Sequence, residues 1–170
     1  MMFSVSADGR LSLEGRAVRC ALGRAGVRPA ADKREGDGAT PAGLWPLRSL
    51  LWRPDRLPAP ASRLPGRAIE ADDGWCDAPQ DPAYNRPVRL PYPASAERMW
   101  REDGLYDLVV VLGYNDRPVV SGAGSAIFMH VSRPGYAATE GCIALALEDL
   151  VELVGRAAPG DGVRVAFQDD

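Results

Sequence analysis

The residues best suited to chemistry are one histidine and one cysteine. His130 is the only histidine in the chain, and Cys142 follows twelve residues later. A free thiol has a pKa of about 8.5, so it needs a neighbouring base to become a thiolate at neutral pH. Pro134 and Gly135 allow the intervening segment to turn back. The spacing is therefore compatible with a nucleophile and its base.

The backbone around Cys142 fits the same chemistry. Gly141, directly before the thiol, allows a positive φ and close backbone approach, which suits an oxyanion site built from N–H groups. A structural interpretation is equally compatible with the spacing. In it, Cys142 is a buried small hydrophobe and His130 a strand-end residue, since free cysteine is among the most buried residue types.

Composition and charge limit the function classes. The 170 residues are 46% apolar and 25% charged, with 18 Gly and 15 Pro. This composition predicts one compact domain over residues 1–170, rich in strands and loops. Twenty basic and 23 acidic residues give a net charge of −3. Because phosphate binding needs clustered positive charge, we expect no nucleic-acid partner, although scattered arginines could bind small carboxylates.

The N-terminal residues, the apolar runs and the cysteines bear on the cellular compartment. The first ten residues contain no basic segment followed by an apolar core, and no apolar run approaches the 18 residues of a membrane span. The three cysteines, Cys20, Cys76 and Cys142, are odd in number and widely spaced, which is typical of a reducing compartment. We therefore expect a cytoplasmic protein without a membrane span.

Apolar alternation predicts the strands that must position the two side chains. A hairpin turns at Asp8-Gly9, and a strand over residues 126–129 is followed directly by His130. A helix begins at Leu147 and ends at Gly155 or at Pro159-Gly160. The remaining predicted strands cover residues 17–23, 44–52, 108–112 and 162–167.

Two loops complete the predicted organisation. Residues 28–41 are charged and Gly-rich, and we expect them to cross the surface. Residues 54–93 contain nine prolines, and their aromatic residues favour an ordered cover over or beside the cleft. The predicted fold is mainly β with one substantial helix, either a sandwich or a partly closed barrel with the site at one open end.

Two segments resemble the L,D-transpeptidase (YkuD-like) catalytic domain. Residues 127–130, Ile-Phe-Met-His, followed by residues 139–143, Thr-Glu-Gly-Cys-Ile, resemble its catalytic half. Residues 33–45, which contain Thr-Pro-Ala-Gly-Leu-Trp, resemble its upstream Thr-Pro-x-Gly-x-aromatic segment. The resemblance covers most of the chain and implies a β-sandwich-like catalytic domain.

The resemblance also implies roles for individual residues. Cys142 would be the nucleophile and His130 its base, with the backbone or hydroxyl of Val131 or Ser132 orienting the imidazole. The N–H groups of Cys142 and neighbours such as Gly141 would bind the oxyanion. The chain departs from the family at two positions, because the family usually has a histidine, asparagine or base where Glu140 stands and an arginine where Ala144 stands. Family substrate contacts at those two positions therefore do not transfer.

The reaction implied by the resemblance is acyl transfer on a peptidoglycan stem peptide. Cys142 would attack the carbonyl of the third residue, usually diaminopimelate, and release the terminal D-alanine. With water as acceptor the enzyme is an L,D-carboxypeptidase of muropeptide recycling, which the expected cytoplasmic location favours. With an amine it is an L,D-transpeptidase that forms cross-links or exchanges D-amino acids. An inactive wall-peptide-binding module and a cysteine hydrolase of another amide are the alternatives.

Several further residues are candidates for substrate binding. Arginine binds carboxylates in a bidentate manner, which suits the termini of a stem peptide. Glu140 could instead bind a substrate ammonium or pair with an arginine. No metal or other cofactor is expected, since Asp72-Asp73-Gly74 lacks further ligands at metal-site spacing. The substrate-binding candidates are Lys33, Asn85, Arg86, Arg133, Thr139 and Glu140.

Overall fold

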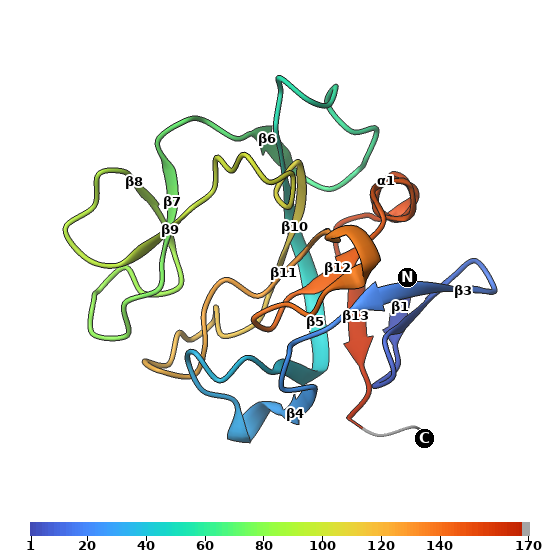
Figure 1. Ribbon diagram of the computed structural model, residues 1–170, viewed down its shortest axis with the longest axis horizontal. Coiled ribbons are helices and arrows are strands. Elements are labelled where there is room, and N and C mark those ends of the chain that lie inside the picture. Colours follow the sequence, from blue (N-terminus) through green and yellow to red (C-terminus); the bar gives the residue numbers. More distant parts are fainter. Residues whose placement is uncertain (168–170) are drawn as a thin grey trace.

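The computed structural model describes residues 1–167, so the last three residues of the expected domain lie outside the description (Figure 1). It contains one α-helix, α1 (Leu147–Arg156), and two single 3-10 turns at Ala30–Asp32 and Pro134–Tyr136. The strands are β1 (Met2–Val5), β2 (Arg10–Leu13), β3 (Arg16–Ala21), β4 (Val27–Pro29), β5 (Thr40–Trp52), β6 (Gly66–Ala68), β7 (Asp73–Cys76), β8 (Pro87–Arg89), β9 (Ala96–Arg98), β10 (Leu108–Leu112), β11 (Phe128–Val131), β12 (Ile143–Leu145) and β13 (Gly162–Val165).

The strands of the larger sheet pair in a closed ring. Its order is β10-β11-β12-β3-β2-β1-β13-β5, and β5 pairs again with β10. The long strand β5 closes the ring because residues 43–46 pair with β13, whereas residues 47–52 pair with β10. Closure leaves no free edge between these strands. The prediction of a mainly β, sandwich-like or barrel-like fold is confirmed.

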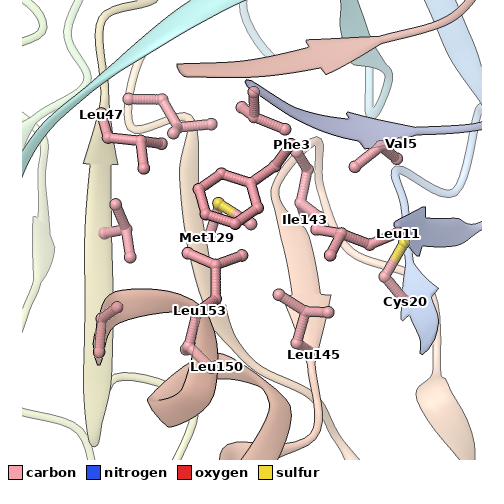
Figure 2. Close-up of a cluster of buried hydrophobic side chains, with 14 of the residues drawn as sticks. Phe3, Val5, Leu11, Cys20, Leu47, Met129, Ile143, Leu145, Leu150 and Leu153 are labelled. Atoms are coloured by element: carbon pink, nitrogen blue, oxygen red, sulfur yellow. The ribbon is translucent and has the colours of Figure 1, made fainter. Parts of the chain in front are cut away.

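One main core lies inside the ring, and α1 packs against it. Met129, Ile143 and Leu145 from β11 and β12 contact Leu150 and Leu153 of the helix (Figure 2). The helix presents leucines at this face because its apolar residues recur at helical spacing. Each buried leucine contributes about 1.5–3 kcal/mol relative to exposure. The predicted helix is confirmed and ends at Arg156.

A second core lies on the other face of β10 and β11. Successive side chains of a strand point to opposite faces, so Val109 and Phe128 face away from the main core. The three-stranded sheet β8-β7-β9, to the left in Figure 1, covers this face. Trp75 of β7 meets Phe128 edge to face, with ring centroids 4.9 Å apart. This second face also carries Cys142, which belongs to the same cluster.

The two long loops are more structured than expected. Residues 54–93 contain β6, β7 and β8, and only Asp77 of this stretch lines the cleft described below. Its first part instead runs beside α1, where Arg63 donates a hydrogen bond to the carbonyl of Arg156. We expected residues 28–41 to cross the surface. That prediction is wrong at Lys33, whose side chain is buried and only 2% exposed.

Strand boundaries also differ from the expectation. Strand β5 begins at Thr40 rather than at residue 44, and His130 lies inside β11 rather than after it. Alternation did not reveal β9 or β12, since strands of three residues are too short to show a period. Among the described residues, no helix is long and apolar enough to cross a membrane.

Candidate active site

Two parallel strands bring His130 and Cys142 to one face of the ring. In the β11–β12 register, Met129 lies opposite Ile143 and His130 opposite Ala144. Met129 and Ile143 point into the main core, so by alternation His130 and Cys142 point to the other face. Both side chains line one cleft of about 510 Å³. The structure therefore brings the two residues together.

The thiol of Cys142 is held by backbone groups. Its S–H donates to the carbonyl of Ala126 at 3.2 Å, and the N–H of Phe128 donates to the sulfur at 3.4 Å. Burial, with an addition from the Glu97 charge, raises the pKa of the Cys142 thiol to about 12. At neutral pH the resting nucleophile is therefore a thiol, which has to lose its proton during attack.

His130 is arranged to take that proton. Its Nδ1 lies 2.8 Å from the carbonyl oxygen of Val131. Because a carbonyl only accepts, Nδ1 carries the hydrogen and Nε2 keeps a free lone pair. Burial lowers the pKa of His130 to about 4, so the imidazole is neutral at pH 7. The structure places the orienting group at Val131, whereas the N–H of Ser132 donates to Leu145.

The buried neutral imidazole makes the stability of the protein depend on pH. The unfolded histidine has a pKa of about 6.5, so the unfolded chain binds the proton more strongly. The contribution of the neutral His130 to the free energy of unfolding is complete above pH 6.5 and is lost as the pH falls towards about 4. We expect His130→Gln to reduce the loss of unfolding free energy between pH 7.5 and pH 4.5 by about 2.5 kcal/mol. Urea unfolding at the two pH values measures this, and equal losses in both proteins would contradict it.

The turn before Cys142 requires glycine at position 141. Gly141 has a φ of +137°, and a Cβ there would lie 2.8 Å from the carbonyl oxygen of Ala39. The Thr139 hydroxyl accepts from the Gly141 N–H at 3.1 Å and donates to the Cys142 carbonyl at 2.7 Å. Thr139 therefore shapes the nucleophile turn as well as lining the cleft. Among residues 1–167, no hydrogen bond uses the Cys142 N–H, which leaves it available to an oxyanion.

Lys33 lines the cleft but has partners within its own loop. Its Nζ donates to Asp37 and to the carbonyl of Arg34, both at 2.7 Å. Burial acts to raise the pKa of Asp37, but the hydrogen bonds from Lys33 and from two backbone N–H groups lower it overall. These contacts give Lys33 a structural role, and a contact with substrate stays a prediction. Lys33 holds together the loop of residues 33–39, whose Ala39 carbonyl abuts Gly141.

Asn85 and Arg86 do not line the cleft, contrary to the expectation. Asn85 Oδ1 accepts from the Trp75 indole at 2.9 Å and from the Ala126 N–H at 3.0 Å, and its amide nitrogen donates to two further carbonyls. Asn85 thus positions Ala126, which holds the thiol. Arg86 donates to the carbonyl of Asp116. Asn85 is therefore fully bonded within the fold, and the exposed Arg86 lies outside the cleft lining.

Arg133 and Glu140 line the cleft as expected. Arg133 is half exposed and lies 3.6 Å from Asp103, so much of its guanidinium remains open to a ligand. Glu140 is exposed and pairs with Arg24 at 3.0 Å, in line with the arginine pairing considered for it. Ala144, at the position of the missing family arginine, is buried in the floor of the cleft.

Several cleft residues could not be found in the sequence. Tyr106 packs edge to face against His130, with ring centroids 5.5 Å apart, and donates its hydroxyl to Glu97 at 2.6 Å. Arg101 stacks on the Tyr106 ring and binds Asp103. Tyr106 and Arg101 come from irregular segments, and Glu97 comes from a strand of three residues, so no periodic signal links them to the dyad. The remaining acidic groups that line the cleft are Glu35 and Asp77.

Comparison with known proteins identifies related sequences. A family model described as the YkuD L,D-transpeptidase catalytic domain matches residues 2–165. An L,D-transpeptidase from Mycobacterium smegmatis is 13% identical, with a TM-score of 0.46, and the match covers 97% of this chain and 58% of that one. L,D-transpeptidase 3 from Mycobacterium tuberculosis, solved with a faropenem-derived adduct, is 17% identical, with a TM-score of 0.44 and coverages of 99% and 60%. This chain thus spans about three fifths of their length. No curated protein matches it significantly.

Proposed function

Since the chain belongs to the L,D-transpeptidase (YkuD) catalytic-domain family, we propose that it transfers the acyl part of a peptidoglycan stem peptide through Cys142. The bond cleaved is the L,D bond after the third residue, diaminopimelate, and D-alanine is released. The observation that supports this most strongly is the neutral thiol and neutral imidazole lining one cleft. The other two cysteines, Cys20 and Cys76, are not among the residues that line this cleft.

The geometry supports a two-step reaction. As the sulfur of Cys142 attacks the third-residue carbonyl, its proton passes to Nε2 of His130. The oxyanion forms beside the free N–H of Cys142. The carbon–nitrogen bond then breaks, the nitrogen of D-alanine takes the proton from His130, and a thioester remains on Cys142. An acceptor gives a proton to His130, attacks the thioester carbonyl and displaces the sulfur, which recovers the proton.

The acceptor is either water or an amine. The expectation of hydrolysis rested on the N-terminal residues, and no contact within the cleft favours water. An amine acceptor is favoured by one observation, the carboxylates of Glu35, Asp77 and Glu97 in the cleft wall. We therefore propose L,D-transpeptidation as a second function of the same thioester, beside L,D-carboxypeptidation. The cellular compartment stays a prediction.

The experiment is incubation of the protein with soluble disaccharide-tetrapeptide, with and without a stem tripeptide that carries a free side-chain amine. Mass spectrometry follows the products. Loss of one alanine gives the tripeptide and indicates hydrolysis, whereas dimers indicate transpeptidation. If neither product forms while the tetrapeptide still binds, the protein is a wall-peptide-binding module and the proposal is wrong. Cleavage of other amides alone would indicate a different cysteine hydrolase.

A further inference from the structure

One side of the cleft carries carboxylates that the dyad chemistry does not use. Glu97 comes from β9, and Asp77 directly follows β7, so one lies in the three-stranded sheet and the other at its border. Glu35 joins them from the loop of residues 33–39, where its Oε2 accepts hydrogen bonds from Tyr84 and Ser125. We call Glu35, Asp77 and Glu97 the acidic wall. All three line the cleft that contains Cys142.

Glu97 is held in place with one oxygen left over. Its Oε1 accepts the Tyr106 hydroxyl at 2.6 Å and lies 3.5 Å from Arg101. Within the part of the chain that the structure describes, Oε2 takes part in no hydrogen bond, and the side chain is 27% exposed. One carboxylate oxygen is thus fixed by the protein, while the other remains free for a ligand.

Asp77 provides a second, independent observation. Its Oδ1 is buried and has no hydrogen-bond partner among residues 1–167. A buried acceptor without a donor is costly, so such groups are rare in folded proteins unless a ligand or water satisfies them. An ammonium has three donors and a positive charge, which suits two carboxylates that line one cleft. The acidic wall therefore favours a positively charged hydrogen-bond donor over a ligand carboxylate.

The carboxylates of the acidic wall interact electrostatically with one another and with the reacting thiol. Burial raises the pKa of Glu97, and the carboxylates of Asp77 and Glu35 raise it further. Among charged groups, Glu97 also contributes most to the raised pKa of the Cys142 thiol, and both side chains line the same cleft. A bound cation would relieve the repulsion among the three carboxylates.

We propose that Glu97 and Asp77 bind the ammonium of the amine that attacks the Cys142 thioester, which makes Glu97 the residue that determines acceptor specificity. The proposal rests on the proposed acyl-transfer function. The ammonium gives one proton to the Glu97 carboxylate and becomes an amine. Its nitrogen bonds to the thioester carbonyl, its second proton goes to His130, and the carbon–sulfur bond breaks. His130 then returns that proton to the sulfur, and Glu97 releases the other to solvent.

The test compares Glu97→Gln with the unchanged protein. Glutamine keeps an oxygen to accept the Tyr106 hydroxyl but removes the charge. We expect the acceptor KM for dimer formation to rise about tenfold, since a charge-assisted hydrogen bond is lost. Hydrolysis, measured as the free tripeptide formed from tetrapeptide without added acceptor, should change less than twofold. Asp77→Asn should shift the acceptor KM in the same direction. Glu102→Gln, an equal charge change on an exposed residue paired with Arg56, is the matched control and should leave it unchanged.

A binding measurement separates this inference from the proposed function. Calorimetric titration of the Cys142→Ala protein with the stem tripeptide reports acceptor affinity without any turnover. An unchanged acceptor KM and affinity in Glu97→Gln, with normal D-alanine release, would overturn the acceptor site alone. So would the absence of dimers at every acceptor concentration. If D-alanine is never released but Glu97 controls tripeptide affinity, the proposed function fails and the ammonium site stands.

Discussion

Replacing Cys142 by alanine is expected to abolish D-alanine release from the disaccharide-tetrapeptide, with a loss of at least about a thousandfold. The thioester cannot form without the sulfur, and His130 alone has no nucleophile to activate. Because Cys142 is buried against Ala126 and Phe128 and alanine fits the same space, the fold should persist. Product mass measures activity, and circular dichroism verifies folding.

Cys20 provides a matched control for this experiment. It is a buried thiol whose pKa burial raises to about 12, as in Cys142, but it lies in the main core on β3. A thiol-reactive carbapenem should therefore add one acyl group to the native protein and to Cys20→Ala, and none to Cys142→Ala. Labelling of Cys142→Ala, or D-alanine release that survives in it, would show that the nucleophile lies elsewhere.

Replacing Lys33 by methionine is expected to lower the free energy of unfolding by about 3 kcal/mol, or the melting temperature by about 8 °C. Lys33 is 2% exposed and its partner Asp37 is 11% exposed, so the variant leaves a carboxylate with little solvent and without its buried cation. The two backbone N–H groups that donate to Asp37 remain in the variant, so the loss of unfolding free energy should lie near the lower end of the range for broken buried ion pairs. Chemical denaturation at pH 7 measures it.

Arg28→Met is the control for Lys33→Met. Arg28 contacts the same Asp37 carboxylate at 3.4 Å, but its side chain is 40% exposed. An exposed ion pair contributes less than about 1 kcal/mol, so this variant should unfold almost like the native protein. If the two variants lose equal stability, burial of the Lys33–Asp37 pair is not what holds the loop together. Addition of Asp37→Asn to Lys33→Met should recover part of the loss by removing the unpaired charge.

The sequence by itself determined the parts of the protein that depend on local pattern. Alternating apolar residues predicted the first hairpin, a continuous β-branched run predicted β10, and helical spacing from Leu147 predicted α1. These patterns survive folding because a strand or helix buries one face wherever it packs. The order of the motifs around His130 and Cys142 was enough to suggest the family, which the match over residues 2–165 confirms.

Only the tertiary structure decided what surrounds the dyad. Alternation places His130 and Cys142 on one face, but it does not say that β7, β8 and β9 cover that face or that Glu97 and Tyr106 come with them. An asparagine can bind substrate at the surface or hold the backbone in the interior, and its amino-acid type does not distinguish the two roles. For Asn85, only its hydrogen-bond partners decide between them. Those partners, such as Ala126, are distant in sequence. Short strands without a period pair through long-range register, and register is fixed by the packing of the whole chain rather than by local residues.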